Sequence, residues 1–101
     1  MKQEIFDSYV SSIHKRFNIE SPDELFVKTK RRDVVDARHI LYYMCHERPM
    51  RIIQQYMLDR GYDISHSSII YGVSQVTKLI KEDDDYRNLI EELKLDAVQS
   101  A

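Results

Sequence analysis

Apolar residues recur at spacings of three and four along most of this chain, which is the periodicity of the buried face of an α-helix. The pattern predicts helices over residues 2–17, about 33–48, about 51–60, about 66–81 and about 84–95. A capping box formed by Ser21, Pro22 and Glu24 predicts a further short helix through about Val27. We therefore expect an all-α fold, a compact bundle of about six helices that forms a single domain over residues 1–101.

The helix expected from about residue 66 has two chemically different faces. Its inward positions are Ile69, Val73, Val76 and Ile80, and its outward positions are Ser67, Tyr71, Ser74 and Lys78. Ser65 is suited to be its N-cap, and Gly61 is suited to close the preceding helix in the left-handed conformation. Residues of about 51–81 are thus predicted to form a helix-turn-helix with a turn over residues 61–64. In such a motif the start of the second helix enters the major groove of DNA.

Small polar side chains are concentrated at the start of that second helix. The candidate base-contacting residues are Ser65, His66, Ser67, Ser68 and Tyr71, because hydroxyl, imidazole and phenol groups all hydrogen-bond to base edges. Simpler explanations exist for parts of this cluster. N-capping alone accounts for Ser65, and His66 taken alone is typical of a surface histidine.

Charge is unevenly distributed along the chain, and the net charge does not show this. The 101 residues are 43% hydrophobic and 32% charged, with two Gly and two Pro, which favours a folded helical domain. The net charge is −2, whereas DNA-binding proteins are usually basic. Residues 28–81, however, carry ten basic and five acidic groups, and residues 82–101 carry two and seven. At physiological salt, screening over about 8 Å lets a basic patch act separately from a distant acidic one.

The candidate contacts to the DNA backbone or the minor groove are cationic. Lys28, Lys30, Arg31 and Arg32 lie within five residues, and Lys78 lies on the outer face of the later helix. Such a loop can neutralise phosphates or enter a narrow, electronegative minor groove. The alternative is an ordinary solvated run of charge.

Other protein classes find little support in the sequence. The single Cys45 cannot form an internal disulfide and is predicted to be a buried thiol. No signal peptide or membrane span is visible, so we expect a cytoplasmic protein without a membrane partner. His39, Cys45 and His46 share one helix but not the spacing of a metal or catalytic site, so no cofactor, metal or enzymatic activity is predicted. Without a heptad seam, a monomer is expected.

Three blocks of the sequence resemble the C-terminal double-stranded-DNA-binding domain of the bacterial replication initiator DnaA. Phe17-Asn18-Ile19 with Glu24-Leu25 is similar to the motif YFNI...EEL. Residues 28–38 with Ile40 and Tyr43 are similar to a basic loop followed by the helix ARQIAMYL, and residues 65–70 are similar to the signature DHTTVL or DHSTVI. The resemblance covers most of the chain, and it implies a Trp-repressor-like helix-turn-helix that binds origin boxes.

The resemblance also implies roles for single residues. It places His66, Ser67 and Ser68 at the positions that read the major groove, and Lys30 at the position of a minor-groove arginine. It further implies that Arg32 and Arg38 lie near the phosphate backbone.

The chain departs from this pattern at four positions. Ser65 replaces an aspartate, which keeps the cap but loses an acceptor for cytosine, and Lys30 lacks the planar fork of arginine. Tyr71 replaces a histidine, and Gly72 replaces an alanine. A glycine inside a helix costs about 1 kcal/mol relative to alanine, so Gly72 indicates either close packing or relaxed constraint.

These features favour a free-standing, sequence-specific double-stranded DNA-binding protein that regulates replication or transcription. A chain of this length contains no nucleotide-binding module and no GxxxxGK[ST] phosphate loop, so a complete initiator is not expected. The alternative is a degenerate helix-turn-helix scaffold that acts as a protein–protein interaction module. Its partner surface would be the acidic last helix or the outer face of the helix over 66–81.

Overall fold

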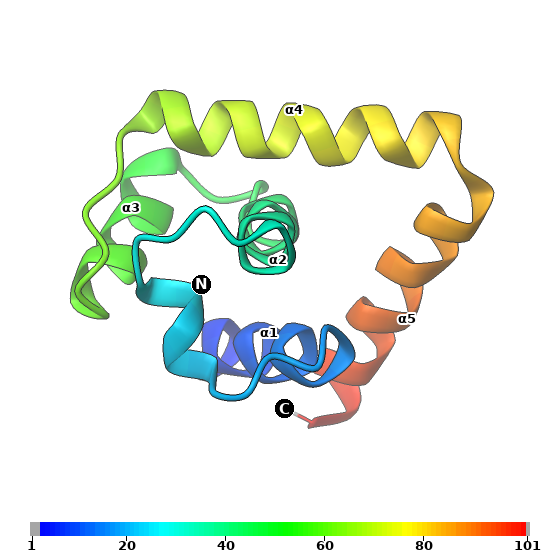
Figure 1. Ribbon diagram of the computed structural model, residues 1–101, viewed down its shortest axis with the longest axis horizontal. Helices are drawn as coiled ribbons and strands as arrows, with labels where there is room; N and C mark the ends of the chain where they lie inside the picture. Colours follow the sequence, from blue (N-terminus) through cyan, green and yellow to red (C-terminus); the bar gives the residue numbers. More distant parts are fainter. Residues whose placement is uncertain (1–2, 101) are drawn as a thin grey trace.

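The computed structural model describes residues 3–100, and these residues contain five α-helices, one 3₁₀ helix and no strand. The elements are α1 (Gln3–Arg16), the 3₁₀ helix η1 (Pro22–Phe26), α2 (Arg32–Met44), α3 (Met50–Asp59), α4 (His66–Glu82) and α5 (Asp84–Ser100). Figure 1 shows α2 end-on at the centre, with α4 across one side, α1 on the other, and α3 and α5 at the two ends. The expected all-α class is confirmed.

The expected count of six helices is wrong, because the short element after Ser21 is a 3₁₀ helix and the number of α-helices is five. Ser21 caps it as predicted, with its Oγ accepting a hydrogen bond from the Asp23 N–H at 3.3 Å. The backbone N–H of Glu24 bonds to the carbonyl three residues back, at Ser21, which is the 3₁₀ pattern. The Glu24 side chain does not complete the predicted box, since its Oε1 accepts from Arg31 instead.

Helix boundaries differ from the periodicity at the ends of α2 and α5. Residue 2, where the first helix was expected to begin, lies outside the described residues. The helix expected to end just before Pro49 ends at Met44, where the Cys45 N–H already bonds to carbonyls both three and four residues back. The last helix extends to Ser100, beyond the predicted end near residue 95.

The core forms around α2, which packs against α1, η1 and α4. Its buried apolar side chains are Val34, Ala37, Ile40, Leu41, Tyr42 and Met44. The predicted thiol Cys45 is also buried, and burial raises its pKa to about 12. On the far side, α1 packs on α5, and the buried Ser12 hydroxyl donates to the Leu93 carbonyl at 3.1 Å.

Local signals fix the chain path between α3 and α4. Gly61 has φ +88°, and the N–H groups of Gly61 and Tyr62 bond to the carbonyls of Leu58 and Met57 at 2.8 and 3.0 Å. This double closure is a Schellman motif, which needs a residue that tolerates positive φ. The chain then crosses to Ser65, whose Oγ accepts from the Ser68 N–H at 3.2 Å and caps α4 as predicted.

Close packing explains the glycine inside α4. A Cβ atom on Gly72 would lie 2.8 Å from Cδ2 of Tyr42 and 2.9 Å from Cδ2 of His39, distances shorter than real Cβ contacts allow. The rings on α2 therefore occupy the space that a side chain at position 72 would fill. Of the two readings of this glycine, the packing contact is the one that the structure supports.

Candidate nucleic-acid interface

The first turn of α4 presents a continuous exposed polar surface. Ser65, His66, Ser67 and Ser68 are all exposed, while Ile69 directly after them is buried on the core. The Oγ atoms of Ser65 and Ser68 lie 3.1 Å apart, so the Ser65 oxygen that caps the helix is also within hydrogen-bond distance of the Ser68 hydroxyl. Unpaired N–H groups and the helix dipole give such a turn a positive potential, which suits an anionic partner.

His66 is held in one orientation by α3. Its Nε2 lies 3.0 Å from Oε1 of Gln54, and Nε2 of Gln54 donates to the Ile64 carbonyl at 2.6 Å. Because the Gln54 oxygen can only accept, the His66 Nε2 must carry the proton in this contact. A neutral ring then leaves Nδ1 as a hydrogen-bond acceptor. The spacing of apolar residues does not single out Gln54, so its contact with His66 was not predicted from the sequence.

Tyr71 lies one turn farther along α4 on the same face, with 58% of its surface exposed. The rings of Tyr71 and of His39 in α2 form a T-shaped pair, with centroids 5.7 Å apart and planes at 79°. Together with Ser67 and Ser68, these two rings line an open hollow between α2 and the start of α4. The remaining lining residues are Arg38, Tyr42, Tyr62 and Ile64.

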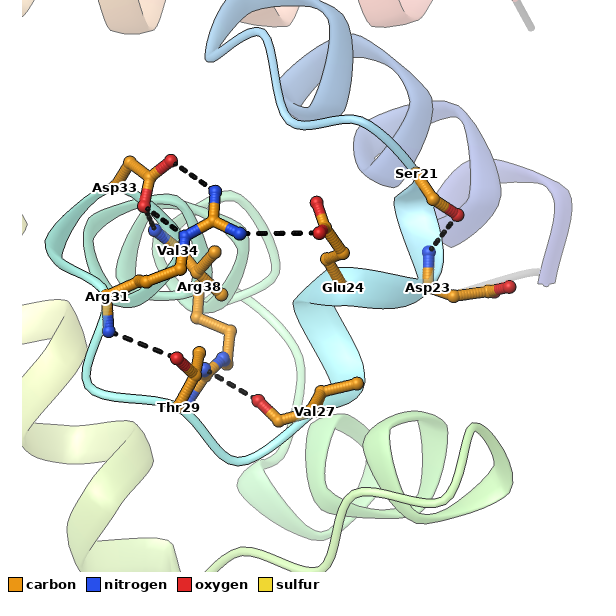
Figure 2. Close-up of polar contacts among 9 residues, drawn as sticks. All are labelled: Ser21, Asp23, Glu24, Val27, Thr29, Arg31, Asp33, Val34 and Arg38. Atoms are coloured by element: carbon orange, nitrogen blue, oxygen red, sulfur yellow. Dashed lines mark hydrogen bonds and ion pairs between the residues drawn. The ribbon is translucent and has the colours of Figure 1, made fainter.

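The basic loop before α2 contains one arginine that is already neutralised. Figure 2 shows the Arg31 guanidinium between two carboxylates, at 2.9 Å from Asp33 and 3.3 Å from Glu24. The Asp33 hydrogen bonds raise the pKa of Arg31, and the same bonds to Arg31 lower the pKa of Asp33. Thr29 fixes the backbone of this turn by accepting from the Arg31 N–H at 3.1 Å.

Four of the other five cations in the predicted set face solvent. Lys28, Lys30 and Lys78 are exposed, and within residues 3–100 none of them has a carboxylate in ion-pair range. The Arg32 side chain is 91% exposed, and its contact to Asp36 is long, at 3.6 Å. An exposed pair of this kind contributes little to stability and can exchange for a phosphate.

Arg38 lies inside the domain. Only 6% of its surface is exposed, and its guanidinium stacks on the Tyr62 ring at 4.6 Å from the centroid. Its Nη1 donates to the Tyr62 hydroxyl at 2.6 Å. Figure 2 shows its second bond, from Nη2 to the Val27 carbonyl at 3.1 Å. Arg38 therefore joins the start of the basic loop to the connection that precedes α4. A basic residue next to a basic run gives no sequence signal of burial.

The described residues show no sign of a metal or membrane site. Across residues 3–100, no three His, Cys, Asp or Glu side chains gather as possible metal ligands. In the same part of the chain, no helix combines the length and apolar character needed to cross a membrane.

Fold and site together define an all-α domain in which Arg38 links the residue before the basic loop to the connection that precedes the capped, polar start of α4. By sequence the chain is related to DnaA, as its motifs predicted. It is 32% identical over 87% of its length to the chromosomal replication initiator protein DnaA of Nautilia profundicola. The DnaA proteins of Helicobacter hepaticus and Campylobacter jejuni subsp. doylei are each 29% identical, over 93% and 87% of the chain. The chain spans about a fifth of the length of these relatives, and no protein-family model matches it.

Proposed function

We propose that this domain binds double-stranded DNA sequence-specifically, with the start of α4 in the major groove and the loop over residues 28–32 on the phosphates or in the minor groove. The observation that carries the proposal is the exposed first turn of α4, a set of hydrogen-bonding side chains on a helix whose opposite face is buried on α2. In this proposal α3, the connection over 60–65 and α4 act as a helix-turn-helix.

The relatives support the proposal, since the resemblance to DnaA lies in blocks that correspond to its DNA-binding domain and not to its ATPase part. A role as a non-enzymatic regulator of replication or transcription, acting as a cytoplasmic monomer, belongs to the same proposal. Tyr71 and Ser65 stand where the family pattern has other side chains, so we expect a preferred sequence that differs from the DnaA box.

The contact set follows from exposure. Ser65, His66, Ser67, Ser68 and Tyr71 are proposed to face the bases, and Lys28, Lys30, Arg32 and Lys78 to face the phosphates. Arg31 would have to leave two carboxylates to join them, and Arg38 would have to leave the interior. We therefore propose that both arginines stabilise the conformation of the loop and do not contact DNA.

A protein-interaction role is the second candidate, and one observation favours it. Helix α5 is acidic and carries Leu95 and Val98 on its surface, which are 62% and 74% exposed. Exposed apolar residues rimmed by charge mark interaction sites when they form a patch. The DNA proposal draws on more of the chain, because it uses two separate segments that the fold brings near each other.

Selection of duplexes from a random pool, followed by titration at two salt concentrations, tests the DNA proposal. Enrichment of one sequence, with affinity that falls steeply as salt rises, is the expected result. A pool that stays random, or binding that does not respond to salt, would contradict it and would favour the interaction module.

A further inference from the structure

The contact between Tyr71 and His39 is an arrangement that the proposed contact set does not by itself explain. Aromatic side chains on an exposed helix surface sample several rotamers, and Tyr71 is more than half exposed. Here the planes of the Tyr71 and His39 rings meet at 79°, a T-shaped geometry that aromatic pairs prefer. Contact with a half-buried ring restricts the directions in which the phenol can point.

Gly72 makes this contact possible. The His39 ring has Cδ2 at 2.9 Å and Cγ at 3.3 Å from the place where a Cβ on residue 72 would stand. Any side chain at position 72 would push this ring, or α4 itself, away. His39 thus packs against α4 at Gly72, next to Tyr71.

The same ring belongs to the polar surface at the start of α4. His39 and Tyr71 line the hollow that Ser67 and Ser68 also line. Because Tyr71 is four residues beyond Ser67, the two side chains point the same way and lie about 6 Å apart along the helix axis. Base pairs stack about 3.4 Å apart, so a phenol held at that place would face a base pair one or two steps from the one that faces Ser67.

We propose that His39 is a positioning residue that holds Tyr71 for base recognition, and that the contact of His39, Gly72 and Tyr71 sets part of the DNA sequence preference of this chain. The inference rests on the proposed DNA binding and adds to it. His39 itself touches no base. Its effect on recognition passes through the orientation of the Tyr71 hydroxyl, which can both donate and accept a hydrogen bond.

Base preference at a single position separates positioning from general support of the fold. Affinities for the best selected duplex and its single-base-pair variants are measured for the wild type, Tyr71→Ala, His39→Ala and the double variant. Tyr71→Ala is expected to lose about tenfold discrimination at one base pair. His39→Ala should lose most of the same discrimination at the same base pair, and the double variant should be no worse than Tyr71→Ala.

His46→Ala is the matched control, because His46 also stacks on a tyrosine of α2, Tyr43, at 4.7 Å, without touching Tyr71. It should leave the preference unchanged. In the free protein, ¹H NMR of the Tyr71 ring gives a reading without DNA, and the ring protons should shift in His39→Ala and not in His46→Ala. If His39→Ala fails to fold, His39→Gln removes the ring and keeps a polar side chain of similar reach.

The outcomes are distinct for the two proposals. Folded wild-type protein that selects no duplex would overturn the DNA proposal and this inference together. Protein that selects a duplex, with His39→Ala and His39→Gln retaining the preference at the Tyr71 base pair, would overturn the inference alone. A loss spread evenly over all base pairs, or a further loss in the double variant, would also overturn it, since it would show a role of His39 in the general fold.

Discussion

At the scale of single residues, His66 is the sharpest case, because its ring is fixed by a neighbour before any DNA arrives. The bond to Gln54 uses Nε2, and so it leaves one defined ring nitrogen for a base edge. Truncation to Ala should therefore reduce discrimination between the best duplex and its variants by about 1 to 3 kcal/mol, with a smaller effect on nonspecific binding.

Ser74→Ala provides the matched control for His66→Ala. Ser74 is also exposed on α4, but its hydroxyl already donates to the Tyr71 carbonyl at 2.7 Å within the helix. Competition binding of labelled duplexes would measure both variants. Equal discrimination in wild type and His66→Ala would show that His66 is an ordinary surface histidine.

Lys30 and Arg31 are neighbours of equal charge that differ in their surroundings. Lys30 has no carboxylate in ion-pair range among residues 3–100, whereas Arg31 has two. Lys30→Ala should weaken binding to all duplexes and reduce the salt slope by about 1, and Arg31→Ala should reduce it by much less. Affinity measured at several salt concentrations decides between them, and a slope reduced equally by both substitutions would mean that Arg31 leaves its carboxylates for the DNA.

At the scale of elements, Arg38 connects two segments that are far apart in the sequence. Its two hydrogen bonds reach the carbonyl before the basic loop and the hydroxyl of Tyr62 before α4. Arg38→Met should lower the free energy of unfolding by about 2 to 3 kcal/mol, since it removes two hydrogen bonds from a buried charged donor. Arg32→Met is the matched control on the same helix and should change stability by less than about 0.5 kcal/mol. Urea unfolding measures both, and similar values for the two variants would contradict the structural role of Arg38.

The sequence predicted those elements whose signals are local. Helical periodicity located all five α-helices, and the caps at Ser65 and Gly61 followed from their hydrogen-bonding and conformational preferences. It did not predict features that depend on contacts between distant segments. The hydrogen bonds of the buried Arg38, the bond from His66 to Gln54 and the contact of Gly72 with His39 all join residues at least ten positions apart. Helical spacing carries no information about such pairs.

At the scale of the whole molecule, burial and pairing reduce the number of cations that can neutralise DNA. Six cations were candidates from the sequence, and removing Arg31 and Arg38 leaves four that face solvent. The slope of log Kobs against log salt should then be about −3.6, where all six would give about −5.4, taking about 0.9 for each phosphate. Titrations between low and physiological salt measure this slope. A value near −5 would show that the loop rearranges on DNA.

The dependence of stability on pH is a second property of the whole molecule, and His39 sets part of it. Burial lowers the pKa of His39 below its ordinary 6.5, with the positive charges of Arg38 and Arg32 acting in the same direction and Asp36 opposing them. The unfolded chain therefore takes up the proton first as the pH falls. The contribution of His39 to stability is complete above about pH 7 and is lost from about 6.5 down through its lowered pKa. Protonation would also place a charge under α4, against the Tyr71 ring. Urea unfolding at pH 7.5 and 5.5 should show a larger loss in the wild type than in His39→Gln, because glutamine does not titrate. Equal losses in the two proteins would mean that His39 takes up a proton as readily in the folded domain as in the unfolded chain.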